Sequence, residues 1–292
     1  MSEPFNGTFG VEEIDTAVNL DAVIIGVPFE DNSKIYPKGA SLAPNKIREI
    51  SYFFSGQSFS EQNIHSLNVL DLGDLKITRK YDETMSSLAE NVSKVLQKNA
   101  LPIILGGDHS IALGTTKGII KSQKKIDAVI WLDAHVDLMD AYPEKEKYSR
   151  ATSCKRIFDL NFFNAENYYF IGCRGHNLGL EEVEMIKTNG MTTIEAQLFS
   201  SRDILKEISK IIDRHDSFYV SLDIDVLDPA YAPGVSVPEP GGLSSRELFS
   251  ILQILANKTK CFEIVEINPN KDFNDLTSMV ACKAIFELLD SK

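Results

Sequence analysis

At residues 126–137 the chain reads Ile126-Asp127-Ala128-Val129-Ile130-Trp131-Leu132-Asp133-Ala134-His135-Val136-Asp137, an apolar run that ends in three side chains able to bind metal. The run has the length and composition of a buried strand. Side chains of an extended chain alternate between its two faces, so Asp133, His135 and Asp137 are predicted to project to one side. Carboxylate oxygens together with imidazole suit a divalent metal of the manganese, iron or zinc type.

Two further apolar runs end in side chains of the same kinds. Phe218–Leu222 leads into Asp223-Ile224-Asp225, whose two carboxylates are predicted to share a face. Leu101–Leu105 ends in Gly106-Gly107-Asp108-His109-Ser110, where two glycines let the backbone turn sharply. Together the three strand ends supply two histidines and four aspartates: His109, Asp133, His135, Asp137, Asp223 and Asp225.

Apolar runs of strand length alternate with amphipathic segments along the chain. Ala22–Val27 is a further strand, and a helical pattern with one apolar face begins at Asp82. Ser244 and Glu247 form a capping box that predicts the start of another helix. This alternation predicts an α/β fold, a three-layer αβα sandwich around a mostly parallel sheet with right-handed crossovers. Ligands of such folds bind beyond the carboxyl ends of the strands, where the three clusters lie.

The composition is typical of a soluble globular protein. The 292 residues are 43% hydrophobic and 25% charged. Four widely separated cysteines indicate free thiols in a reducing cytosol. No apolar run approaches the ~20 residues that span a bilayer, and residues 1–6 show no signal-peptide pattern. We therefore expect a cytoplasmic protein, with a single domain over residues 1–292 because no linker or repeat interrupts the pattern.

The charge balance bears on the partners. A formal net charge of −12 argues against nucleic acid as a partner and is compatible with a small cationic substrate. The alternative is that the acidity only aids solubility.

Six candidate ligands are too many for one metal ion that keeps a position open for substrate or water. Two ions that share bridging carboxylates fit better. Two divalent ions roughly 3.5–4 Å apart can activate a shared water near neutral pH. Four aspartates also balance the charge of two divalent cations.

Three sequence blocks resemble the signatures of the ureohydrolases, the arginase and agmatinase superfamily of binuclear manganese enzymes. The blocks are Gly106–Ser110, Asp133–Asp137 and Ser221–Pro229, and the resemblance extends from about Val23 to the C-terminus. It implies two Mn²⁺ per chain and a homo-oligomer, a trimer or hexamer. It also implies that one metal is held by His109, Asp133, Asp137 and Asp223 and the other by Asp133, His135, Asp223 and Asp225, with Asp133 and Asp223 as bridges.

The resemblance also assigns a role to Glu266. This residue, in Glu263–Pro269, matches the family glutamate that pairs with a substrate guanidinium, a planar cation that favours a bidentate carboxylate. The implied reaction is hydrolysis of a guanidino compound to urea and an amine. Asp137 would orient the nucleophile by a hydrogen bond, and Glu266 would fix the substrate carbon in line. The alternative is that Glu266 is an ordinary acid at a strand end.

Within the superfamily the chain most resembles agmatinase. Leu138–Pro143 stands where arginases carry a loop with Asn and Ser, and Pro233–Gly242 and Gly26–Phe29 are also similar to agmatinase. The predicted reaction converts agmatine to urea and putrescine, a step of polyamine biosynthesis. Arginine and guanidinobutyrate remain alternative substrates. A non-catalytic, metal-stabilised relative that binds a guanidino or amine ligand is a further alternative, and a metallophosphatase is weaker because its Asn-His block is missing.

Two positions depart from the superfamily pattern. Arg150 follows Tyr148-Ser149 where members commonly carry a proton-shuttling His, and Arg cannot shuttle because it stays protonated; Arg150 would then have another role, such as holding the loop or a carboxylate. Val235–Val237 replaces a Thr-Gly-Thr. Proton transfer is predicted to pass to His176, which follows the strand predicted at Tyr168–Cys173. The alternatives are that bulk water protonates the amine and that His176 is only a loop residue.

Overall fold

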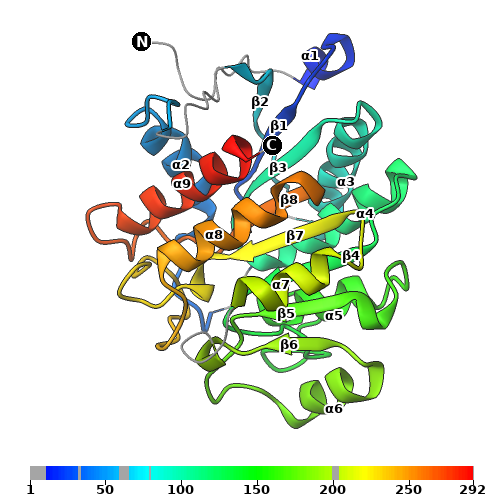
Figure 1. Ribbon diagram of the computed structural model, residues 1–292, viewed down its shortest axis with the longest axis vertical. Helices are drawn as coiled ribbons and strands as arrows, with labels where there is room; N and C mark the ends of the chain where they lie inside the picture. The colour runs from blue at the N-terminus through cyan, green and yellow to red at the C-terminus, as the bar shows by residue number, and fades with distance from the viewer. Residues whose placement is uncertain (1–10, 32–33, 59–65, 79, 199–203, 292) are drawn as a thin grey trace.

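The structure, a computed structural model, describes residues 11–31, 34–58, 66–78, 80–198 and 204–291. In chain order its strands are β1 (Ala22–Val27), β2 (Val69–Asp74), β3 (Leu101–Gly106), β4 (Ala128–Leu132), β5 (Tyr168–Ile171), β6 (Thr192–Ile194), β7 (Phe218–Asp223) and β8 (Thr259–Val265). They form one sheet in the order β2-β1-β3-β8-β7-β4-β5-β6 (Figure 1). Every pairing among these strands is parallel.

Helices cover both faces of the sheet (Figure 1). They are α1 (Val11–Thr16), α2 (Ala43–Ser51), α3 (Tyr81–Gln97), α4 (Ala112–Ser122), α5 (Ser153–Phe158), α6 (Leu180–Asn189), α7 (Ile204–Ile212), α8 (Ser245–Leu255) and α9 (Leu276–Asp290). One hydrophobic cluster joins the sheet to α2, α7, α8 and α9, and a second joins it to α1, α3, α4 and α5. In β4, Ile130 and Leu132 belong to the first cluster, whereas Val129 and Trp131 belong to the second. The predicted three-layer αβα sandwich is confirmed.

The strands next to the candidate site are buried along their whole length. Every residue of β3, β4 and β7 is buried, which explains why their sequences are continuous apolar runs rather than alternating patterns. Trp131 and Phe218 are fully buried, and each side chain of this size stabilises the fold by about 1.5–3 kcal/mol. These strands therefore form a rigid base for the residues that follow them.

Two compositional predictions have outcomes in the structure. All four cysteines are free, as predicted, and the structure shows that they are also buried. Among the described residues no helix has the length and apolar character needed to cross a membrane. Residues 1–6, on which the signal-peptide prediction rests, lie outside the described residues.

Sequence patterns did not predict α1, α2, α6 or β6. Glu182 is the only buried residue of α6, so this helix has no apolar stripe to reveal it. β6 is an edge strand of 3 residues, too short to show a period. α6 and β6 therefore show no apolar period in the sequence, whereas α2 was missed although it buries Ile47 and Ile50 on one side.

Candidate metal centre and active site

Four neighbouring strands, in the order β3-β8-β7-β4, carry the candidate site. Because they are parallel, their carboxyl ends meet at one edge of the sheet. His109 follows β3, Glu266 follows β8, Asp223 ends β7 and Asp133 follows β4. The strand order brings together residues as far apart as His109 and Glu266, which are 157 positions apart in the sequence.

The backbone turns as soon as these strands end, so the prediction that the chain stays extended was wrong. Residues 133–135 form a bend, and Asp225 lies in a 3₁₀ turn, Ile224–Val226. Asp137 and Glu266 have φ angles of 51° and 66°, in a left-handed region that non-glycine residues seldom adopt. The predicted ligands converge because the chain folds back at each strand end. Uncommon backbone geometry of this kind is typical of functional sites.

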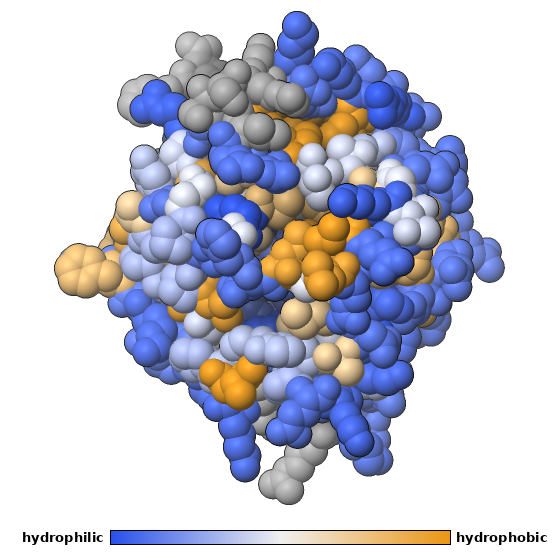
Figure 2. All heavy atoms as spheres, turned by 90° about the horizontal axis from the view of Figure 1, so that it is seen from below, coloured by the Kyte–Doolittle hydropathy of each residue, from blue (hydrophilic) through white to orange (hydrophobic). Residues whose placement is uncertain are grey.

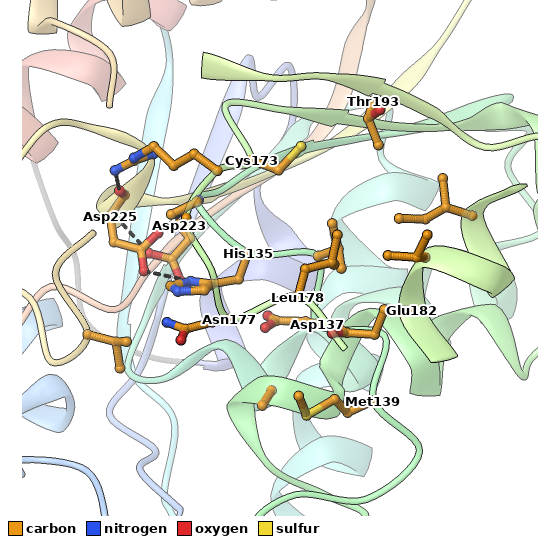
Figure 3. A pocket seen from close by; sticks show the side chains of 18 of the residues that line it. His135, Asp137, Met139, Cys173, Asn177, Leu178, Glu182, Thr193, Asp223 and Asp225 are labelled. Carbon is orange, nitrogen blue, oxygen red and sulfur yellow. Dashed lines mark hydrogen bonds and ion pairs between the residues drawn. The ribbon is translucent and has the colours of Figure 1, made fainter. Parts of the chain in front are cut away.

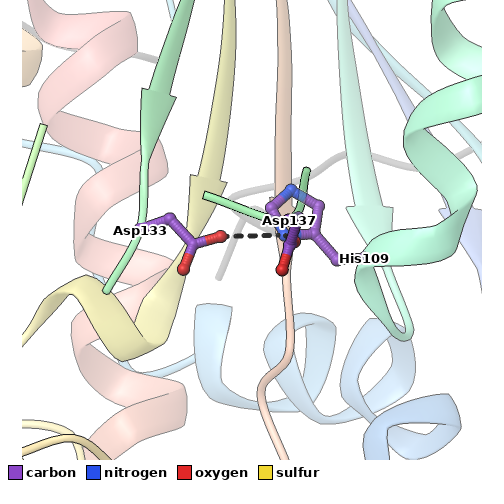
Figure 4. Close-up of side chains that lie close together, drawn as sticks. All are labelled: His109, Asp133 and Asp137. Carbon is purple, nitrogen blue, oxygen red and sulfur yellow. Dashed lines mark ion pairs between the residues drawn. The ribbon is translucent and has the colours of Figure 1, made fainter. Parts of the chain in front are cut away.

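Three carboxylates surround one nitrogen of His109. Its Nδ1 lies 3.2 Å from Asp133 Oδ2, 3.2 Å from Asp137 Oδ2 and 3.3 Å from Asp223 Oδ2. Figure 4 shows Asp133 and Asp137 facing the imidazole. Ligand atoms of His109, Asp133 and Asp137 all lie within 4.8 Å of one another. This arrangement is suited to one divalent ion.

A second group of ligands forms around His135. Its Nδ1 lies 3.3 Å from Asp133 Oδ1 and 3.1 Å from Asp225 Oδ2. Figure 3 shows His135, Asp223 and Asp225 side by side at one end of a pocket. Asp133 belongs to both groups, one oxygen to each. Asp133 could therefore contribute a ligand to each of two ions.

Three of these carboxylates each accept a hydrogen bond from a backbone N–H group on one of their two oxygens. The N–H of His135 donates to Asp133 Oδ1 at 2.6 Å, and that of Asp225 donates to Asp223 Oδ1 at 2.8 Å. The N–H of Ala134 donates to Asp225 Oδ1 at 3.1 Å. Fixing one oxygen of a carboxylate sets the direction of the other, so the site is organised before any ion binds.

A buried polar chain that the sequence did not reveal orients His109. Its Nε2 lies 2.8 Å from Ser221 Oγ, which in turn donates to Glu263 Oε1 at 2.7 Å. The imidazole also stacks on Trp131, with ring centroids 4.1 Å apart. Partners of this kind fix the tautomer of a metal-binding histidine. The available signal was that Ser221 and Glu263 are polar residues within apolar strands.

The charges of the site favour metal binding. Within the described residues, the ion-pair partners of the six ligands are one another. Burial raises the pKa of both Asp133 and Asp223, and nearby Asp225 adds to the rise. Burial lowers the pKa of His109, but its carboxylate neighbours outweigh this and raise it. His109 Nδ1 and Asp133 Oδ2 are buried without a hydrogen-bond partner. Divalent ions would satisfy these atoms and relieve the repulsion.

The whole chain is similar to a known group of enzymes. A family model described as the Arginase family matches residues 20–290. The chain belongs to the arginase family. It is 35% identical to "Arginase 1, mitochondrial" of Oryza sativa subsp. indica over 93% of this chain and 81% of that protein. It is 32% identical to an agmatinase of Bacillus cereus over 99% of this chain and 98% of that protein.

One similar solved structure is named for a different activity from those of the arginase and the agmatinase. The formimidoylglutamase from Bacillus subtilis superposes with a TM-score of 0.89 at 26% identity, covering 99% of this chain and 91% of that one. The predicted membership of the ureohydrolase superfamily is confirmed, with agmatinases among the relatives. Because the relatives have different substrates in their names, family membership leaves the substrate open.

A cavity of about 800 Å³ adjoins the metal ligands of this arginase-family site. In Figure 3 it extends from His135, Asp223 and Asp225 toward Cys173 and Thr193. The view from below in Figure 2 shows a mostly hydrophilic face with an apolar patch near its middle. The apolar side chains that line the cavity include Met139, Leu178, Val183, Ile186 and Met191.

Glu266 lines this cavity, but it already has a cationic partner. Arg150 Nη1 donates to Glu266 Oε2, and the N–H of His109 donates to Glu266 Oε1 at 2.8 Å. Burial raises the pKa of Glu266 to about 8, and Arg150 opposes that rise. Arg150 lies in a 3₁₀ turn before α5, rather than in the helix itself. Of the two roles open to Arg150, holding a carboxylate is the one that the structure shows.

His176 stands apart from the other predicted residues. Its side chain is exposed, and it is not among the residues that line the cavity, although Gly175 and Asn177 are. Its role in proton transfer stays a prediction.

Proposed function

We propose that this arginase-family protein binds two divalent metal ions and hydrolyses a C–N bond of a linear guanidino or amidine compound. The observation that carries the proposal is the pair of ligand groups that share Asp133 beside a cavity. When bound, two ions polarise the substrate and make water a nucleophile near neutral pH. Manganese is the proposed metal, two ions per chain, held by His109, Asp133, Asp137 and Asp223 and by Asp133, His135, Asp223 and Asp225.

Two carboxylates have proposed roles besides binding metal. Asp137 lines the cavity, and its Oδ2 accepts a hydrogen bond from Ser153 Oγ at 3.0 Å. This contact fixes the direction of the carboxylate, which supports its proposed role in orienting the attacking water. Glu266 is proposed to face the reacting carbon of the substrate, since it lines the cavity one strand away from Asp223.

Agmatine is the substrate that we propose first. The agmatinase of Bacillus cereus is similar over nearly the whole of both chains, and Leu138–Pro143 lacks the Asn and Ser of the arginase loop. The charged residues that line the cavity are mostly acidic, which suits a cationic tail. The proposed products are urea and putrescine, as in polyamine biosynthesis. Arginine and guanidinobutyrate are the alternatives within the same chemistry.

One observation favours a second candidate, a formimidoyl compound. Such a substrate carries a hydrogen where a guanidino group has a third nitrogen, so it needs one hydrogen-bond acceptor fewer. Arg150 already occupies an oxygen of Glu266, and a related structure is a formimidoylglutamase. A non-catalytic binder has less support, because a binder has no need of six converging ligands.

The proposals on localisation and oligomeric state rest on the composition of the chain and on its family membership. We propose a cytoplasmic homo-oligomer, a trimer or hexamer, that does not act on nucleic acid. The net charge of −12 supports the last point.

The test is a substrate panel with the manganese-loaded protein. Urea release is measured with agmatine, arginine and guanidinobutyrate, and formamide release with N-formimidoyl amino acids. We expect hydrolysis within this panel, with agmatine the best guanidino substrate. Absence of any hydrolysis by fully loaded protein would contradict the proposed function. A kcat/KM for arginine at or above that for agmatine would reject the agmatine assignment alone.

A further inference from the structure

Four carboxylates surround the guanidinium of Arg150. Nη1 forms an ion pair with Glu266 Oε2, and Nη2 lies 3.6 Å from Asp108 Oδ2 and 3.9 Å from Glu30 Oε1. Nε lies 3.8 Å from Asp31 Oδ2. We call Glu30, Asp31, Asp108 and Glu266 the arginine cluster.

The Arg150 side chain is fixed from several directions. It is only 5% exposed, and its guanidinium lies over the ring of Tyr36, 4.7 Å from the centroid, a favourable position for a cation. Ser153 Oγ lies 2.8 Å from the carbonyl oxygen of Arg150 and 3.0 Å from Asp137 Oδ2, so its one hydrogen can be donated to either acceptor. The backbone of Arg150 is therefore connected to a predicted metal ligand.

Glu266 has no oxygen left without a donor. Its Oε1 accepts from the N–H of His109 and its Oε2 accepts from Arg150. Each carboxylate oxygen can accept a second hydrogen bond, so a substrate guanidinium would have to share the oxygens of Glu266 with His109 and Arg150 or displace Arg150. Displacement would leave a buried cation without its closest partner. Removing one partner of a buried ion pair is strongly unfavourable, because the other charge stays desolvated.

We propose that Arg150 fills, from within the chain, a guanidinium subsite formed by the arginine cluster, and that it thereby determines which substrates react. This inference rests on the proposed function. The reacting group of the substrate then binds beside the Arg150–Glu266 pair and makes no ion pair with Glu266. One amino group of a guanidino compound is then left without Glu266 as its hydrogen-bond acceptor. A formimidoyl compound has a hydrogen in place of that amino group, so it loses no hydrogen bond. Arg150 is a positioning residue that acts through Glu266.

The direct test is binding of guanidinium ion to the manganese-loaded Arg150→Ala variant. Removing the side chain empties a space of guanidinium size between Glu266 and Tyr36. Isothermal calorimetry with millimolar guanidinium chloride should show binding to this variant and none to the wild type. A ligand that binds only the folded state also raises the melting temperature, so the same ion should restore part of the stability lost in the variant.

Two further variants keep the test decisive. Arg150→Lys retains a cation next to Glu266 and should bind guanidinium far more weakly than Arg150→Ala. The double variant Arg150→Ala, Glu266→Gln should lose the binding. Wild-type protein that binds guanidinium as tightly as Arg150→Ala would overturn the inference, and so would a folded, metal-loaded Arg150→Ala that binds none.

Kinetics of Arg150→His supply an independent readout and cover the case in which Arg150→Ala does not fold. A hydrogen bond to a charged group contributes enough to change affinity by roughly 10–100-fold. The KM for agmatine should therefore fall by about that factor, with a smaller change in kcat and no change in KM for a formimidoyl compound. An unchanged or higher KM for agmatine, at normal metal content, would overturn the inference. Failure of every variant to hydrolyse any substrate would reject the proposed function instead, and guanidinium binding would still decide the role of Arg150.

Discussion

Two groups of four carboxylates lie side by side at the carboxyl edge of the sheet, and they are neutralised differently. The carboxylates of the arginine cluster surround Arg150, and Lys38 Nζ lies 3.2 Å from Asp31. The other group, which we call the metal cluster, contains Asp133, Asp137, Asp223 and Asp225. In the described part of the chain its ion-pair partners are His109 and His135 alone.

The difference indicates which group is the candidate for binding ions from outside the chain. Burying a carboxylate is costly unless it is paired. Glu266 has a permanent cation beside it, because Arg remains charged at all relevant pH values. Among the described residues, Asp133 and Asp223 form ion pairs only with histidines, and burial raises the pKa of each. The described carboxylates that form no ion pair with Lys or Arg, and that lie beside imidazole nitrogens, are therefore the candidates for binding metal.

Asp133→Ala should have the largest effect of the substitutions proposed, and this effect should be confined to the metal cluster. Asp133 contributes an oxygen to both ligand groups, so its loss should reduce bound manganese to below one equivalent and lower activity by about 10³-fold. Metal analysis and kcat/KM measure the two effects. Asp82→Asn, at an exposed position in the first turn of α3, is the matched control and should retain both. Full metal content in Asp133→Ala would contradict the assignment of the metal cluster.

Arg150→Ala should act on the other cluster and mainly on stability. Leaving Glu266 and its neighbours without a buried cation is expected to lower the free energy of unfolding by about 3–5 kcal/mol. Urea unfolding of the metal-loaded protein measures it, with Arg150→Lys expected to lose less. If the two variants were equally stable, the carboxylates would not depend on the guanidinium.

His176→Ala lies outside both clusters and tests proton transfer. If His176 protonates the leaving amine, kcat should fall by about 10²-fold with metal content unchanged. An unchanged kcat would mean that His176 is a loop residue and that bulk water supplies the proton. The exposed position of the side chain makes this substitution harmless to packing, so a change in kcat can be interpreted directly.

Glu263→Gln should weaken the metal cluster only indirectly. Glu263 accepts a hydrogen bond from Ser221, which contacts His109 Nε2. Loss of such a supporting group lowers metal affinity by about 10–100-fold, measurable by competition with a chelator. Tyr219→Phe removes another donor to Glu263 and keeps both Ser221 and Glu263 in place, so it should have a smaller effect. Equal affinities in Glu263→Gln and the wild type would show that His109 needs no such support.

The metal cluster could be predicted from the sequence because its signal is local. Each ligand follows an apolar strand within a few residues, and the αβα alternation places those strand ends at one edge. The arginine cluster could not be predicted in this way. Arg150 and Glu266 are 116 positions apart, and the sequence around either residue contains no pattern that predicts their contact. It depends on strand order, on the turn before α5 and on the left-handed backbone at Glu266, all of which are set by long-range packing.

The bends after β4 and β7 were missed for a related reason. Alternation along a strand is a sound rule only while the chain stays extended, and hydrogen bonds from backbone N–H groups to Asp133 and Asp223 fold it back. The Asp and His residues thus indicated a candidate metal site. The bends that bring them together depend on hydrogen bonds that residue type alone does not predict.

Metal stoichiometry tests the central claim most directly. The wild-type protein is stripped with a chelator, loaded with manganese, freed of excess ion and analysed for metal per chain. The shared position of Asp133 between two ligand groups predicts two equivalents of manganese. A value that stays at one or below under saturating manganese would contradict the dinuclear centre.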